Sequence, residues 1–321
     1  MSTELTISTS LSLETEQLST ALRENLQAAR AVRTKQSYAQ LWKRFQTDTG
    51  WDVPVTPLQV AEYISQARNQ NTGKLLSVAT VNALLAAIST AHHDRGLPSP
   101  CQDRGVRETL KGIRRTRGIA QRQAQAVTLE NLRDMVSLLQ DGSLKSQRDK
   151  ALLLVGFFTA MRRSELAALK VEDIQFTQYG MTVTIRRSKT DQEGAGHSIS
   201  LDYRMDRVCP VQALKDWLDS AYLVSGPVFL SFYKWDRPHY GKAIDPRNIA
   251  GLFKQLARSV NLPNWELVSG HSLRAGLATT AGEQNIPLHQ IAQVTGHKHL
   301  PTLYKYIRAG KARDNAANKL K

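Results

Sequence analysis

A chain of 321 residues is long enough for two domains, and 43 Lys and Arg against 28 Asp and Glu give it a net charge of +15. Such an excess of positive charge indicates a polyanionic partner, either nucleic acid or an acidic membrane surface. The longest apolar run, Ala151 to Phe158, is shorter than the ~20 residues of a membrane span and is expected to be a buried core helix. The first 20 residues contain no Lys or Arg, which argues against a secretory signal. Cys101 and Cys209 form no disulfide framework or zinc pattern, so a reducing cytoplasm fits.

The N-terminal part of the chain is expected to be helical. Residues 1–20 are rich in Ser, Thr, Leu and Glu, and they are expected to form a flexible tail or, alternatively, an arm that contacts a neighbouring subunit. Apolar residues then recur at helical spacing, which predicts helices over residues 19–32, 34–48, 56 onward, 77–95 and 106–117. Thr34 is placed to cap the second of these helices, and Thr56-Pro57 to open the third. Short loops without a strand signal predict a small all-helical domain over residues 21–118.

Basic residues on these helices are candidates for DNA contact, because most protein–DNA hydrogen bonds go to the phosphate backbone. The candidates are Lys35, Lys43 and Arg44 on the 34–48 helix and Arg114, Arg115 and Arg117 at the end of the 106–117 helix. The alternative for the second group is a solvated helix end, whose cations suit the helix dipole.

Residues 119–127 are polar and uncapped and are expected to form a linker to a second domain over residues 128–321. This domain is expected to be mostly helical, with Thr128 capping its first helix and Asp245-Pro246 opening a later one. Residues 181–187 and 198–201 are predicted to pair as antiparallel strands, and residues 228–232 to form a short strand. The turn in the first pair is rich in Gly, Asp and Gln, so Lys189 is expected at an exposed hairpin edge.

The C-terminal stretch combines three kinds of side chain that suit a phosphodiester. His271 and Arg274 are three apart and share one face if a helix opens after His271. Gly296 fits a helix C-cap and is followed by His297. Arg binds phosphate oxygens bidentately, and a phenol such as that of Tyr306 can be a covalent nucleophile. Taken singly, each residue has an ordinary structural alternative.

In order and spacing, H-S-L-R from His271, G-H from Gly296 and a Tyr nine residues later resemble the C-terminal signature of the tyrosine recombinase, or phage-integrase, family. The family's upstream Arg, with an acidic residue one turn later, has a counterpart in residues 160–166, and its hairpin Lys has one in residues 185–190. The S-G-H-S-x-R-x-G-x-A pattern from Ser269 is similar to that of Cre-type members. The resemblance runs from about Thr34 to about Arg308.

The resemblance implies a mainly α fold: an N-terminal helical core-binding (SAM-like) domain and a mostly helical catalytic domain with a small antiparallel β-sheet. It implies a site-specific DNA recombinase that cleaves and rejoins duplex DNA at an inverted-repeat site through a 3′-phosphotyrosine and a Holliday junction. It further implies that the protein acts as a homotetramer on DNA and is associated with the nucleoid rather than with a membrane. The reaction is expected to need no metal and no nucleotide cofactor. The alternatives are a type IB topoisomerase, a telomere resolvase, or a catalytically silent DNA-binding module.

The resemblance also assigns roles. Arg162 and Arg274 hold the phosphate oxygens, Tyr306 attacks, and Lys189 gives a proton to the departing 5′-oxygen. The remaining three residues assist: His271 takes or relays the tyrosine proton, His297 binds the phosphate, and Glu165 orients cations. The resemblance also makes Arg247 and Asn82 candidate readers of base edges, with an ordinary surface residue as the alternative for each.

Two neighbours compete with these assignments. Arg163 adjoins Arg162, and the spacing to Glu165 selects Arg162; Tyr304 lies near Tyr306 and is expected to pack internally. The three histidines near the C-terminus lack a cysteine or carboxylate to complete a metal site, so none is expected.

Overall fold

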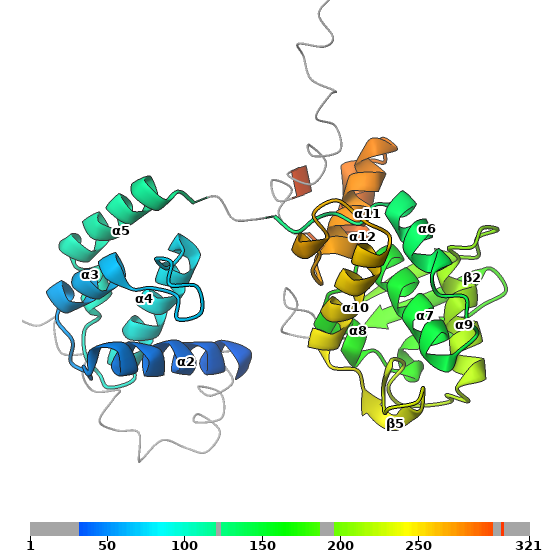
Figure 1. The fold of residues 1–321 in the computed structure, drawn as a ribbon, viewed down its shortest axis with the longest axis horizontal. Coiled ribbons are helices and arrows are strands. Elements are labelled where there is room, and N and C mark those ends of the chain that lie inside the picture. Colours follow the sequence, from blue (N-terminus) through cyan, green and yellow to red (C-terminus); the bar gives the residue numbers. More distant parts are fainter. Residues whose placement is uncertain (1–31, 120–122, 187–195, 298–302, 305–321) are drawn as a thin grey trace, which may run out of the picture. The chain divides into compact units, whose positions relative to one another are not determined.

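The computed structural model describes residues 32–119, 123–186, 196–297 and 303–304. The chain divides into two compact units, residues 1–121 and 122–321, and this division falls within the segment expected to be a linker (Figure 1). Each unit has its own hydrophobic core. None of the described helices has the length and apolarity needed to cross a membrane.

The described part of the first unit consists of α2 (Val32–Thr49), α3 (Pro57–Gln66), α4 (Val78–His93) and α5 (Arg104–Arg117), with a short 3-10 helix at Pro100–Gln102. Thr56 and Ser77 cap α3 and α4 by accepting the backbone N–H three residues on. The expectation that Thr34 caps a helix is wrong, because α2 already includes Val32. The predicted helix over residues 19–32 lies almost wholly outside the described residues.

Aromatic side chains form the centre of the first core. Phe45 is fully buried, stacks on Trp42 with ring centroids 5.3 Å apart, and meets the edge of Tyr63 at 4.9 Å. Aliphatic residues of α3 and α4, among them Ile64 and Ile88, fill the remaining space. The helical spacing of apolar residues in the sequence therefore predicts this core correctly.

The described part of the second unit is mostly helical. Its helices are α6 (Leu129–Ser137), α7 (Leu144–Phe158), α8 (Arg163–Ala168), α9 (Pro210–Ser220), α10 (Pro246–Ser259), α11 (Ser272–Glu283) and α12 (Leu288–Thr295), with 3-10 turns at Val171–Asp173 and Trp265–Leu267. Helix α7 lies in the core, and Leu152, Leu153 and Leu154 are fully buried. The expectation that this apolar run is a core helix is confirmed.

Two small antiparallel sheets complete the unit. The first has the order β1-β2-β3, with β1 (Ile174–Phe176), β2 (Gly180–Ile185) and β3 (His197–Asp202), and the second pairs β4 (Leu230–Phe232) with β5 (Pro238–Ala243). Val183 and Ile199 face each other across β2 and β3 and are both buried. The predicted β2–β3 pair is confirmed, whereas β1 and β5 were not predicted.

Backbone and side-chain contacts hold the start of the second unit along α11. The N–H of Gln125 donates to the carbonyl of Leu267 at 3.2 Å, and that of Val127 to the carbonyl of Ser272 at 3.1 Å. Gly276 faces the peptide of Val127, and a Cβ there would lie only 2.5 Å from its carbonyl carbon. Residues 125–127 are thus packed into the unit that carries the C-terminal motif.

Candidate active site

The first part of the site lies at the start of α8. Glu165 is the third residue of the helix, and its carboxylate accepts the backbone N–H of Arg162 at 2.7 Å. The other carboxylate oxygen binds the Arg162 guanidinium, also at 2.7 Å. Only 5% of the Glu165 side chain is exposed, against 19% of Arg162. A buried carboxylate with two bonds to one residue fixes the direction in which that arginine points.

The second part lies where α11 begins. Ser272 is fully buried, and its hydroxyl accepts the N–H of Ser269 at 2.9 Å, while the Ser269 hydroxyl accepts the N–H of His271 at 3.3 Å. These two bonds define a tight turn that leaves His271 exposed at the helix start. Arg274, one turn further, is 7% exposed. The prediction that a helix opens at Ser272 is confirmed.

The third part is the turn after α12. Gly296 has φ +62°, the left-handed conformation that favours glycine, and it ends α12 as predicted. A Cβ at Gly296 would lie 3.7 Å from an amino nitrogen of Arg274. The turn at Gly296 therefore lies beside the Arg274 guanidinium, and His297 follows it in the chain.

The pKa of His297 reflects the burial of its imidazole and the charges near it. Burial lowers the pKa of His297, and the positive charges of Arg274 and then Arg162 lower it further, to about 4. Both guanidiniums therefore lie near enough to the imidazole to disfavour its charged form, and Arg274 has the larger effect. Three of the predicted catalytic residues, drawn from α8, α11 and the end of α12, thus converge on one place.

The hydrogen bonds of His297 also indicate its tautomer. Its Nδ1 lies 2.7 Å from the hydroxyl oxygen of Thr295, and that hydroxyl donates its own proton to the carbonyl of Ile291, also at 2.7 Å. Since a hydroxyl has one proton, Nδ1 must be the donor to Thr295, and the neutral ring carries no proton on Nε2. A hydrogen bond from Nε2 to a phosphate therefore requires a second proton on the ring.

This arrangement predicts a pH dependence. The folded-state pKa of His297, about 4, lies below the value of about 6.5 expected in the unfolded chain, so the unfolded state binds more protons between these values. The wild type should therefore lose stability relative to His297→Gln as the pH falls from 7.5 to 5, as measured by urea unfolding at both pH values. The imidazole should titrate near pH 4 in NMR spectra of the free protein and at a higher pH with duplex DNA bound. Equal pH dependence of the two proteins would contradict the prediction.

Two predicted catalytic residues, Lys189 and Tyr306, lie outside the described residues. Tyr304 is described, and its expected internal packing is wrong because its side chain is 45% exposed. Within the described part of the chain, no group of three or more His, Cys, Asp or Glu side chains is arranged to hold a metal ion.

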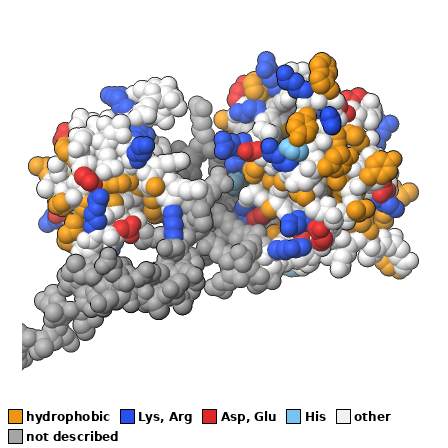
Figure 2. Space-filling model, turned by 90° about the horizontal axis from the view of Figure 1, so that it is seen from below, with side chains coloured by type: hydrophobic (Ala, Val, Ile, Leu, Met, Phe, Trp, Pro, Cys, Tyr) orange, Lys and Arg blue, Asp and Glu red, His pale blue; other side chains and the backbone are white. Residues whose placement is uncertain are grey.

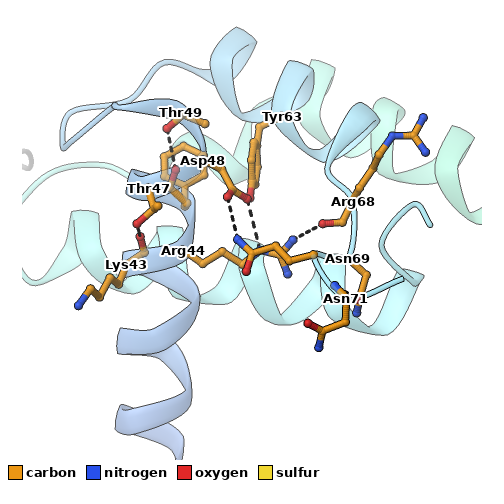
Figure 3. Close-up of polar contacts among 11 residues, drawn as sticks. Lys43, Arg44, Thr47, Asp48, Thr49, Tyr63, Arg68, Asn69 and Asn71 are labelled. Atoms are coloured by element: carbon orange, nitrogen blue, oxygen red, sulfur yellow. Dashed lines mark hydrogen bonds and ion pairs between the residues drawn. The ribbon is translucent and has the colours of Figure 1, made fainter. Parts of the chain in front are cut away.

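The basic candidates of the first unit differ in their surroundings. Lys43 extends from α2 into the open, but Arg44 turns toward Asp48, with Nε 3.3 Å from the carboxylate, and donates to the backbone carbonyl of Arg68 (Figure 3). Asp48 also accepts from the Tyr63 hydroxyl at 2.6 Å. Arg44 thus joins α2 to the loop after α3, a structural role that sequence reasoning missed.

The basic end of α5 is likewise divided. Arg117 points inward and donates to the carbonyls of Leu76, Ile64 and Ser65 at 2.9, 3.3 and 2.6 Å. Arg115 is exposed, as are Lys35, Asn82, Arg114 and Arg247, and Arg114 binds the Asn82 side chain at 3.3 Å. The predicted DNA contacts of Arg44 and Arg117 therefore compete with internal hydrogen bonds, whereas the exposed residues stay candidates.

A stability measurement distinguishes Arg117, which makes internal hydrogen bonds, from the exposed Arg115. Arg117→Ala should lower the free energy of unfolding of the first unit by about 2–3 kcal/mol, because it removes charge-assisted bonds to three carbonyls. Urea unfolding followed by tryptophan fluorescence measures this, since Trp42 and Trp51 lie in the first unit. The control Arg115→Ala should change stability by less than about 0.5 kcal/mol. Equal effects of the two substitutions would count against the assignment.

Comparisons with known proteins test the resemblance. The sequence model of the Phage integrase family matches residues 125–313. An integrase/recombinase xerD homolog of Selenomonas ruminantium is 31% identical over 318 residues, which cover 95% of this chain and 90% of that protein. The recombinase cre of Escherichia phage P1 is 26% identical over 273 residues, covering 79% of this chain and 76% of that protein. The similarity to Cre is present, but it is weaker than that to the xerD homolog.

Solved structures show the same fold. A XerH site-specific recombinase bound to a palindromic difH substrate matches with a TM-score of 0.59 and 19% identity, over 87% of this chain and 76% of that one. A lambda integrase dimer bound to a COC' core site matches with a TM-score of 0.58 and 17% identity, over 91% and 77%. The mainly helical fold class is confirmed. The chain belongs to the phage integrase family, the tyrosine site-specific recombinases.

Proposed function

We propose that this protein cleaves and rejoins duplex DNA at an inverted-repeat site through a covalent 3′-phosphotyrosine formed by Tyr306. The observation that carries the proposal is the convergence of Arg162, Arg274 and His297. Two permanently charged guanidiniums beside a neutral imidazole form a site for a dianionic transition state, because arginine keeps its charge at any working pH. Glu165 holds Arg162 in place through its backbone N–H and its guanidinium.

In the proposed reaction the Tyr306 oxygen attacks phosphorus in line with the 5′-oxygen of the next nucleotide. The new P–O bond to tyrosine forms as the P–O5′ bond breaks. The phenol proton passes to His271, and Lys189 gives a proton to the departing 5′-oxygen. Arg162 and Arg274 stabilise the negative charge that builds on the nonbridging oxygens. The phosphotyrosine retains the energy of the phosphodiester bond, so attack by a 5′-hydroxyl from the partner duplex rejoins the strand without a nucleotide.

The assembly we propose is a homotetramer on two duplex sites, with one subunit on each half-site and a Holliday junction between the two strand exchanges. We propose that residues 1–20 form a tail and that residues 21–118 form a core-binding domain. Residues 119–127 would link this domain to a catalytic domain over residues 128–321. The net charge of +15 and the Lys and Arg side chains spread over the visible face of both units support a polyanionic partner (Figure 2). A DNA substrate would place the protein with the nucleoid of a bacterial or phage-host cytoplasm.

Covalent capture tests the proposal. The wild type and Tyr306→Phe are each incubated with a sheared library of bacterial genomic DNA, denatured in detergent and recovered, and the DNA attached to protein is sequenced. Adducts from the wild type alone, clustered at an inverted repeat, are expected. Adducts that persist in Tyr306→Phe would assign a different nucleophile, and tight DNA binding without any adduct would indicate a silent binding module. Relaxed circles or closed hairpins as products would instead assign a topoisomerase or a telomere resolvase.

A further inference from the structure

Arg163, the residue beside the expected phosphate ligand Arg162, lies directly over the turn that carries His271. A Cβ added at Gly270 would overlap Cγ, Cδ and Nε of Arg163, so the middle of this side chain rests on the bare backbone of Gly270. Within the described residues, no hydrogen bond or ion pair of the Arg163 guanidinium is found. The contact of its stem with Gly270 is therefore the interaction that places this side chain.

Hydrogen bonds within the turn also stabilise residues 269–272. The hydroxyls of Ser269 and Ser272 bind the backbone N–H groups of His271 and Ser269, and Ser272 is fully buried. The stem of Arg163 lies against Gly270 in the same turn, so the turn is held both by its own serine hydroxyls and by an arginine from another element. His271 is exposed at the end of this turn, where α11 begins.

We propose that Arg163 is a positioning residue that keeps the two halves of the active site in register. Arg163 follows Arg162 in the chain, and Glu165 bonds both the backbone and the guanidinium of Arg162. The contact of Arg163 with Gly270 therefore fixes the start of α8 against the start of α11. One half of the site carries Arg162 and the other carries His271 and Arg274, so the contact determines the spacing between phosphate ligand and proton acceptor. This inference rests on the proposed function.

The effect should appear in the rate of chemistry rather than in DNA affinity. A displacement of about 1 Å at a reacting group can cost on the order of 100-fold in rate. Arg163→Ala should slow phosphotyrosine formation at saturating DNA by roughly 10- to 100-fold, with the dissociation constant for DNA changed by less than about threefold. Arg163→Met retains an unbranched stem without charge, and it should recover most of the rate.

The experiment uses the full chain and a nicked duplex that carries the site recovered by covalent capture, with adduct formation and DNA affinity measured for each variant. Gly270→Ala should slow the reaction like Arg163→Ala, because the new methyl displaces the arginine stem. In the Arg163→Ala background, Gly270→Ala should then add little.

Each other outcome overturns the inference. If Arg163→Met is as slow as Arg163→Ala, the charge matters and the stem does not. If Arg163→Ala weakens DNA binding as much as it slows the reaction, Arg163 is a DNA contact; if it changes neither, Arg163 has no role in the reaction. Failure of the proposed function is distinct, since the wild type would then form no adduct.

Discussion

Gly276→Ala is expected to destabilise the second unit by about 3 kcal/mol or more, the upper range for overpacking a close contact. A Cβ at this position would meet three backbone atoms of Val127, and backbone cannot turn away as a side chain can. Relief requires residues 125–127 to move, which breaks the bond between the Val127 N–H and the Ser272 carbonyl. Urea unfolding followed by circular dichroism measures the change.

Gly251→Ala is the matched control. Gly251 is an exposed residue of helix α10, and a Cβ there would meet no atom within 4 Å. Because alanine favours a helix over glycine, this substitution should stabilise the protein by up to about 1 kcal/mol. If Gly276→Ala behaves like Gly251→Ala, residues 125–127 are not packed on α11 as described.

Arg274→Ala is expected to lower the rate of phosphotyrosine formation by about 10²- to 10³-fold, the usual cost of removing one preorganised group that stabilises transition-state charge. Arg274 is 7% exposed and lies beside the turn at Gly296, where His297 follows. Arg274→Lys should recover only part of the rate, since an ammonium lacks the rigid planar pair of N–H donors with which a guanidinium binds two phosphate oxygens. The measurement is the single-turnover rate of adduct formation at saturating DNA.

Arg258→Ala serves as its control. Arg258 is an exposed arginine in the last turn of α10, where its guanidinium lies 5.2 Å from the centre of the Trp265 ring. Arg258→Ala also removes one positive charge, but from an exposed residue that is not among the proposed catalytic residues. It should alter the rate by less than about threefold, because exposed charges are screened by salt. Full activity of Arg274→Lys would contradict bidentate phosphate binding.

The sequence predicts most helix boundaries because these depend on local signals, whereas the proposed catalytic residues come from the resemblance to a family. Thr56 and Thr128, both predicted at helix starts, cap α3 and α6 by accepting the backbone N–H three residues on. Strand β1 was not predicted, because three residues are too few to show an alternating pattern.

What could not be predicted depends on distant backbone atoms. In the sequence, Arg44 and Arg117 cannot be told apart from the neighbouring Lys and Arg residues that prove to be exposed. Their hydrogen-bond partners are backbone carbonyls 24 to 53 residues away along the chain. The position of Arg163 depends on the missing side chain of Gly270, more than a hundred residues later. The glycine at position 296 predicts the left-handed turn that ends α12. The hydrogen bond between His297 and Thr295 was not predicted from the sequence.

The separation of the two cores has a consequence for the energetics of substrate binding. The two cores share no residue, so each unit retains its own buried interior whatever the position of the other. Binding of the proposed DNA substrate by both units then requires neither core to unfold, and the free energy of binding is not reduced by a cost of melting the protein.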